Sequence, residues 1–136
     1  MDFKNPDYLP VFQKRMELLE KLRANPQALE AVKIHYKHNP VDFINDWGVT
    51  FDPRRKPAFM PFIIFPKQEE FVLWLKERSE LKEDGLAEKS RDMGFTWIAS
   101  AFSVWLWLFH EGNKIGWGSR KEMLVDRVGD PDSIFE

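Results

Sequence analysis

The residues of this sequence best suited to chemistry lie in segment 89–96, which reads Lys-Ser-Arg-Asp-Met-Gly-Phe-Thr. Set against the phosphate-binding pattern G-x-x-x-x-G-K-[ST], Gly94 takes the second glycine position and Thr96 the hydroxyl position. Two positions depart from the pattern, because Lys89 stands in place of the first glycine and Phe95 in place of the lysine. By pattern alone, such a segment is more often an ordinary strand-to-helix turn than a phosphate loop.

The physical requirements of a phosphate loop can still be met here. Such a loop needs converging backbone N–H groups, a helix N-terminus behind them, a flexible cation and a hydroxyl for Mg²⁺. The N–H groups of residues 93–96 and a helix that starts at Gly94 supply the first two. A lysine side chain is long enough to reach back across a tight loop from its first residue. Lys89 can therefore bring its charge to the phosphates, or it is a surface lysine at the end of a strand.

Other side chains near this loop have two interpretations each. The amide of Gln68 matches the N6 and N7 edge of adenine, or it is an exposed side chain in the first turn of a helix. Arg91 stabilises charge on the γ-phosphate or is a solvated loop arginine. Asp92 would repel a triphosphate, so we expect it to point outward or to pair with Arg91 or Lys89. Thr96 binds Mg²⁺ or bonds to the helix backbone.

The elements around the loop are predicted from hydrophobic patterning. Residues 85–89 and 114–118 are predicted as short strands, and residues 94–110 as a nearly all-apolar helix between them. A strand, a helix and a strand in this order form a βαβ unit and predict a parallel sheet. The predicted fold class is therefore α/β, the beginning of a P-loop NTPase sheet with an N-terminal helical extension. The helix must be covered on most sides.

The N-terminal part is predicted to be helical. Asn-Pro dipeptides at 5–6, 25–26 and 39–40 are typical of helix starts, and Gly48 would end the third helix. Four prolines between residues 50 and 66 exclude a regular helix there, and a further helix is predicted over 67–78. We expect a helical region with a proline-rich linker at 1–60 and the beginning of an ATPase domain at 61–136.

Composition narrows the function classes. The chain has 136 residues, 20 Lys+Arg against 22 Asp+Glu and no cysteine, which excludes zinc-thiolate and iron–sulfur sites and a thiol nucleophile. The N-terminus lacks an apolar signal core. The most apolar stretch, 97–109, is shorter than the ~20 residues that a membrane helix needs. We therefore expect an intracellular protein without a membrane segment.

Segment 89–96 with its flanks resembles the variant Walker A loop of the large terminase subunits of tailed phages, some of which place the lysine first in the loop. Phe-Pro-Lys-Gln at 65–68 resembles the adenine-recognition segment of that family. Residues 39–49 resemble the helical segment before its ATPase core, and Ser-Arg-Lys at 119–121 resembles a turn that follows. The resemblance covers residues 39–136 and leaves the first two predicted helices without a counterpart.

The resemblance implies an ATP-driven motor that packages DNA into viral capsids, with an ASCE-type P-loop ATPase normally followed by a nuclease domain. ATP and Mg²⁺ would be its cofactors. Its partners would be double-stranded viral DNA, the small terminase subunit, the portal protein and further copies of the chain, all in the host cytoplasm. Catalytic roles would fall to Lys89 and Arg91 and the Mg²⁺ ligand would be Thr96, while the nucleotide-binding residues would be Gln68, Lys89, Ser90, Arg91, Asp92, Met93, Gly94, Phe95 and Thr96.

Two alternatives stay open at the level of sequence. The same loop can begin another P-loop enzyme, such as a helicase or a nucleotide kinase. It can also be accidental, in a non-enzymatic helical interaction module. No four apolar residues followed by paired acids occur in the sequence, so the acidic Walker B strand is not recognised. We therefore expect an N-terminal part of a longer subunit that binds nucleotide without hydrolysing it.

Overall fold

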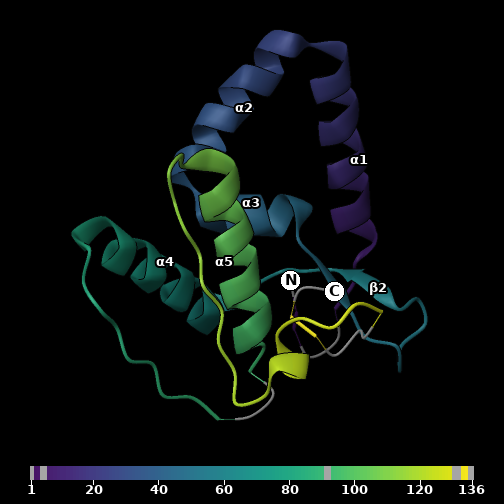
Figure 1. Cartoon of the computed structure of the whole chain (residues 1–136). Helices are drawn as coiled ribbons and strands as arrows, with labels where there is room; N and C mark the ends of the chain where they lie inside the picture. Colours follow the sequence, from purple (N-terminus) through teal and green to yellow (C-terminus); the bar gives the residue numbers. More distant parts are fainter. Residues whose placement is uncertain (1, 4–5, 91–92, 130–132, 135–136) are drawn as a thin grey trace.

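A computed structural model of the chain describes residues 2–3, 6–90, 93–129 and 133–134, and it is mostly helical (Figure 1). The helices and strands, in chain order, are α1 (Leu9–Ala24), α2 (Pro26–His38), α3 (Pro40–Trp47), β1 (Val49–Phe51), β2 (Phe59–Pro61), α4 (Pro66–Leu81), α5 (Phe95–Phe109) and the 3₁₀ helix η1 (Glu122–Leu124). In Figure 1, α1 and α2 form a helical hairpin that stands above α3.

The predicted α/β fold with a parallel sheet is wrong. Within the described residues the sheet consists of β1 and β2 alone, which pair antiparallel. Segments 85–89 and 114–118 form no strand. Strands of a parallel sheet are covered on both faces, whereas residues 85–90 and 114–116 are exposed and Leu86 is 97% exposed. The few apolar residues of these segments therefore lack the cover that a strand of such a sheet requires.

The predicted helix starts are largely confirmed. The side chain of Asn25 caps α2 by accepting hydrogen bonds from the N–H groups of Gln27 and Ala28. α3 begins directly after Asn39, although the Asn39 amide donates back to the carbonyl of His35 instead of capping. α1 begins only at Leu9, three residues after Pro6, while Asn5 lies outside the described residues.

Two basic side chains of α1 dock this helix onto the C-terminal end of α3. The guanidinium of Arg15 donates to the carbonyls of Asn45 and Gly48 at 2.7 and 2.8 Å, and Lys14 pairs with Asp46 at 2.8 Å. Cations are favourable at a helix C-terminus, where carbonyls lack intrahelical partners. Burial lowers the pKa of Arg15, and nearby Asp46 opposes this effect. The contacts explain how α1, which has no buried residue, is held.

The proline-rich stretch after α3 folds into a β-hairpin that the sequence analysis did not predict. β1 and β2 pair with Val49 opposite Pro61 and Phe51 opposite Phe59. Pro61 stands at the end of β2, where a residue without an N–H is tolerated. Because proline is unfavourable within strands, the prolines of this stretch did not suggest a hairpin.

The core lies where α3, α4 and α5 meet the chain after the hairpin. Its buried members are Ile44, Phe62, Ile64, Val72, Ile98, Phe102 and Trp105. The indole of Trp105 donates to the carbonyl of Tyr36 at 2.6 Å, which satisfies its N–H and ties α5 to α2. The helices predicted over 67–78 and 94–110 are confirmed as α4 and α5.

One side of α5 is covered and the other is not. Ile98, Phe102 and Trp105, spaced four and three residues apart, are buried, as expected for one helix face. Trp107 is 71% exposed, and Val104 and Leu108 are half exposed. The expectation of cover on most sides is therefore met on the core side only. Among the described residues, no helix has the length and apolar character that crossing a bilayer requires.

Candidate nucleotide site

A pocket of about 260 Å³ lies between the start of α4, the loop before α5 and the start of α5. It is lined by five of the predicted nucleotide-binding residues, namely Gln68, Lys89, Ser90, Met93 and Phe95. The volume is below the roughly 300–1,000 Å³ typical of small-molecule sites. The pocket therefore suits one part of a nucleotide better than a whole one.

Gln68 joins the two segments that the pocket brings together. Its side-chain oxygen accepts the N–H of Phe65 at 3.2 Å, and its side-chain nitrogen donates to the carbonyl of Met93 at 3.1 Å. Gln68 is only 7% exposed, so the interpretation as an exposed first-turn side chain is wrong. Each end of the amide keeps capacity for one more hydrogen bond.

Gly94 is shaped for close contact with this amide. Its φ is +67°, a left-handed conformation that favours glycine. A Cβ built at this position would come within 2.9 Å of the Gln68 side-chain nitrogen. Gly94 also forms the N-cap of α5, and its carbonyl accepts the N–H of Ile98 at 3.0 Å. Gly94 thus lies in the turn that leads into the helix, where the sequence predicted the helix to start.

Lys89 and Phe95, the two residues that depart from the pattern, lie together. Lys89 is exposed, and its ammonium nitrogen is 5.9 Å from the centroid of the Phe95 ring. Phe95 is the first residue of α5. The relocated lysine therefore lies beside the side chain of the first residue of α5. The first N–H groups of this helix have no intrahelical acceptor.

The other predicted loop residues are placed less centrally. Thr96 is exposed in the first turn of α5, outside the pocket lining. An exposed hydroxyl there is compatible with Mg²⁺, which takes one or two protein ligands besides phosphates and water. Arg91 and Asp92 lie outside the described residues.

Phe71 forms an aromatic wall of the pocket that was not predicted as part of the site. Phe71 lies 4.5 Å from Phe95 between ring centroids and stacks on Trp74 at 5.6 Å. Phe71 lines the pocket together with Phe65, which in turn makes an edge contact with Phe3. Phe71 lies on the face of α4 that packs against the core. Only the approach of α5 shows that this face borders the pocket.

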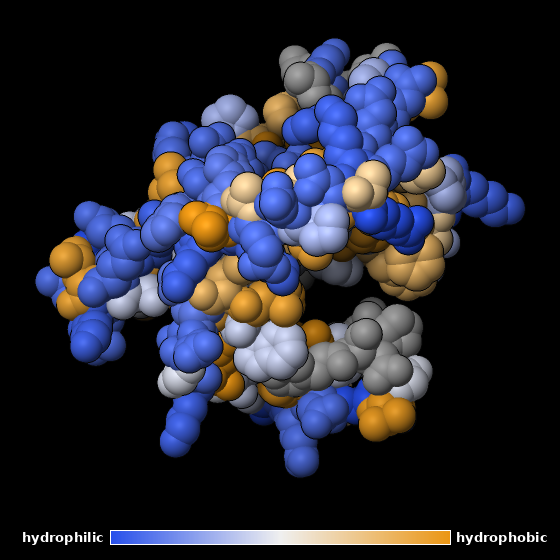
Figure 2. All heavy atoms as spheres, turned by 90° about the horizontal axis from the view of Figure 1, so that it is seen from above, coloured by the Kyte–Doolittle hydropathy of each residue, from blue (hydrophilic) through white to orange (hydrophobic). Residues whose placement is uncertain are grey.

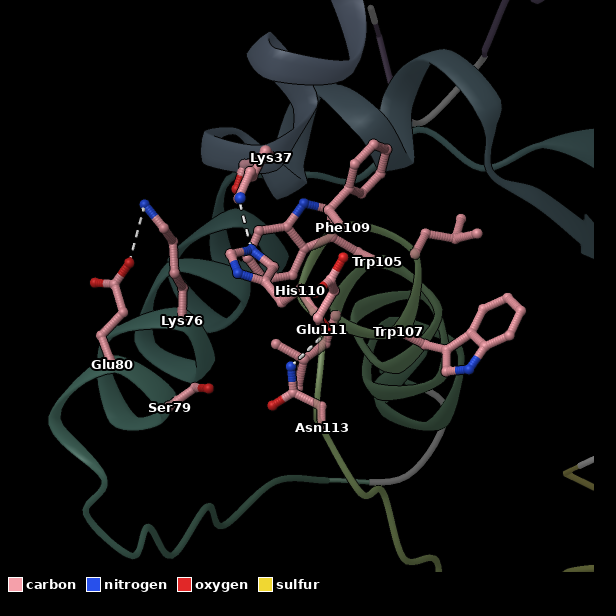
Figure 3. A pocket seen from close by; sticks show the side chains of 12 residues that line it. Lys37, Lys76, Ser79, Glu80, Trp105, Trp107, Phe109, His110, Glu111 and Asn113 are labelled. Atoms are coloured by element: carbon pink, nitrogen blue, oxygen red, sulfur yellow. Dashed lines mark hydrogen bonds and ion pairs between the residues drawn. The ribbon is translucent and has the colours of Figure 1, made fainter.

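A second pocket, of about 590 Å³, opens at the other end of α5 (Figure 3). Lys76 pairs there with Glu80 at 3.6 Å, and a ring nitrogen of His110 lies 3.1 Å from the carbonyl oxygen of Lys37. The amide of Asn113 donates to the carbonyl of His110. These polar groups bind one another, and none belongs to the predicted site.

The basic run at 54–56 lies in the hairpin loop, beside a third pocket of about 650 Å³. Arg54 and Arg55 both pair with Asp52, at 2.9 and 3.7 Å. Hydrogen bonds from Arg54 hold the pKa of the Asp52 carboxyl below its ordinary value. This carboxylate offsets part of the positive charge that DNA phosphates would meet.

Comparison of this chain with protein-family models, with curated proteins and with solved structures gives no match. The site must therefore be judged on its own geometry. What the geometry provides is a buried amide of fixed orientation, a cation beside a helix N-terminus and an apolar wall.

Proposed function

We propose that this chain binds MgATP between α4 and α5, as part of a DNA-packaging ATPase of the large-terminase type that its sequence resembles. The observation that carries the proposal is the hydrogen bond between Gln68 and Met93, which are 25 positions apart. It connects the residue expected to read the base with the loop expected to bind the phosphates.

The orientation of the Gln68 amide favours adenine over guanine. The Phe65 N–H is bound to the oxygen end and the Met93 carbonyl to the nitrogen end, so the two ends cannot exchange. The remaining N–H and oxygen lone pair complement the N7 acceptor and the N6 amino donor of adenine. Guanine has an acceptor, O6, in place of that donor, and the Gln68 oxygen would face it unpaired.

The start of α5 supplies what a triphosphate needs. Its free N–H groups and the positive end of the helix dipole attract anions. Lys89 adds a full positive charge beside Phe95, and the Thr96 hydroxyl would hold Mg²⁺. Bound Mg²⁺ would neutralise charge on the phosphates. In-line attack by water also needs a positioned base and a metal-binding acid, which we expect from other parts of the motor.

A thermal unfolding titration with MgATP, MgGTP and adenosine tests the proposal. At free MgATP near 100 times Kd, binding stabilises the fold by about 2.7 kcal/mol, which raises Tm on the order of 10 °C. Lys89→Ala should remove most of the effect of MgATP. Lys76→Ala is the matched control, because Lys76 pairs with Glu80 on a different part of α4 and should leave it intact.

The alternative of a helical interaction module also has an observation in its favour. The fold is mostly helical, and Trp107 of α5 is exposed to solvent. An interaction module predicts no rise in Tm with MgATP in the unmodified chain. It also predicts the same response of Lys89→Ala and Lys76→Ala, and this result would replace the ATPase proposal.

A further inference from the structure

Phe95 takes the lysine position of the loop pattern, and its ring lies next to a cation, the Lys89 ammonium. The Lys89 ammonium lies 5.9 Å from the centroid of the Phe95 ring, within the roughly 6 Å over which a ring attracts a cation. Both residues also line the pocket between α4 and α5. The two departures from the pattern therefore meet in space.

The ring of Phe95 is held in place by its neighbours. Phe71 contacts it at 4.5 Å between centroids, with the ring planes tilted by 35°. Phe71 is itself stacked on Trp74, at 5.6 Å and 23°. Two successive aromatic side chains, both from α4, thus hold the Phe95 ring in place.

The Phe95 ring gives the Lys89 ammonium an attractive partner beside the first residue of α5. The N-terminal end of a helix carries a partial positive charge, which repels a cation when no anion is bound. The face of an aromatic ring carries partial negative charge and can offset this repulsion. Without this contact, the lysine side chain would extend into water. Binding a phosphate would then restrict several of its rotatable bonds and cost conformational entropy.

We propose that Phe95 is a positioning residue for Lys89, which it holds at the N-terminus of α5 before the triphosphate arrives. This inference rests on the proposed MgATP site and adds a role for a residue that the pattern marks only as a departure. The phosphates then meet a cation already at the site. A lysine at position 95 would be held at this helix by its own backbone. Lys89 is held there instead by its contact with the Phe95 ring.

A double-mutant cycle on MgATP affinity tests the proposal. Phe95→Leu, which keeps an apolar side chain without a π-face, should weaken MgATP binding about two- to fivefold, the size of an exposed cation–π contact. In a Lys89→Gln background, Phe95→Leu should change the affinity by less than this. Phe95→Tyr, which keeps the π-face, should restore the affinity of the unmodified chain.

A spectroscopic measurement without nucleotide gives an independent readout. The ring should shift the NMR signals of the Lys89 side-chain methylene protons upfield, and this shift should be absent in Phe95→Leu and present in Phe95→Tyr. The measurement still applies if Phe95→Leu is partly unfolded, because the unmodified chain and Phe95→Tyr can be compared directly.

The outcomes separate the two proposals. If the unmodified chain does not bind MgATP, the ATP site and this inference both fail. If it binds MgATP and Phe95→Leu weakens binding equally with lysine or glutamine at position 89, the ATP site stands and the positioning role fails. Lys89 methylene signals at ordinary positions in the unmodified chain would also overturn the positioning role.

Discussion

At the scale of single residues, Gln68 makes two contacts whose roles cannot be told apart from the sequence. Its amide closes the N-terminal turn of α4 through Phe65, and it holds the loop before α5 through Met93. A buried amide that loses its partners costs about 1–3 kcal/mol. Variants of Gln68 must therefore be tested for both stability and base selectivity.

Gln68→Ala should lower the preference for MgATP over MgGTP more than it weakens triphosphate binding in general. The physical reason is that the amide edge reads the base, whereas Lys89 and the α5 N-terminus contact the phosphates. Affinities for both nucleotides, measured at a temperature where the variant is fully folded, provide the check. An unchanged ratio of the two affinities would show that Gln68 serves structure only.

Gly94→Ala should destabilise the fold by about 1–2 kcal/mol from left-handed backbone strain, and further through contact with Gln68. The added Cβ would lie 2.9 Å from the Gln68 nitrogen. Gly112→Ala is the matched control, because Gly112 also has a positive φ, of +78°, but its Cβ would meet nothing within 4 Å. Urea unfolding of both variants isolates the contact. Equal losses of stability would contradict a tight junction between Gly94 and Gln68.

At the scale of elements, a polar cluster helps to join the three N-terminal helices. Tyr36 of α2 donates its hydroxyl to Asp46 of α3 at 3.0 Å, and Lys14 of α1 pairs with the same carboxylate. Burial, followed by the neighbouring Asp46, raises the pKa of Tyr36 above its ordinary value of 10.0. Three helices thus share one carboxylate.

This cluster predicts a loss of stability at high pH. Since the folded state keeps its proton to higher pH than the unfolded state, the contribution of Tyr36 is complete below about pH 10 and falls as the pH rises further. Tyr36→Phe should cost about 1 kcal/mol at pH 7 and flatten the decline between pH 10 and 11. Urea unfolding across this range is the measurement. Tyr8→Phe serves as the control, and an identical decline in both variants would refute the role of Tyr36.

At the scale of the whole molecule, polar surface is interrupted by apolar patches. Figure 2 shows a face where hydrophilic side chains prevail and hydrophobic ones gather in smaller groups. Elsewhere, α5 leaves Trp107, Leu108 and Val104 at least half exposed. Large exposed apolar patches promote association.

The chain should therefore self-associate at micromolar concentration, and Trp107→Gln should shift it toward the monomer. The exposed indole is the largest of these side chains, and its removal leaves the buried Trp105 in place. Sedimentation velocity at several concentrations measures the effect. Trp97→Gln is a matched control, since Trp97 lies near the other end of α5 and is 43% exposed. Identical behaviour of the unmodified chain and Trp107→Gln would remove this face from the association.

Most helices could be predicted from the sequence, because helix signals are local. The Asn25 cap, the stop at Gly48 and the apolar run of α5 act within a few residues, and each is found where it was predicted. The turn at Gly94 belongs with them, since a glycine before an apolar run is read from adjacent positions. The sequence also singled out Gln68 and Lys89, although their roles in nucleotide binding remain predictions.

Features that depend on partners distant in the chain could not be predicted from the sequence. A strand needs a neighbouring strand to pair with. Segments 85–89 and 114–118 form no such pair, whereas the proline-rich stretch pairs with itself as β1 and β2. The burial of Gln68 and the meeting of Lys89 with Phe95 likewise require α4 and α5 to pack together. Hydrophobic burial decides which helix faces meet, and this free energy comes from contacts that sequence spacing does not contain.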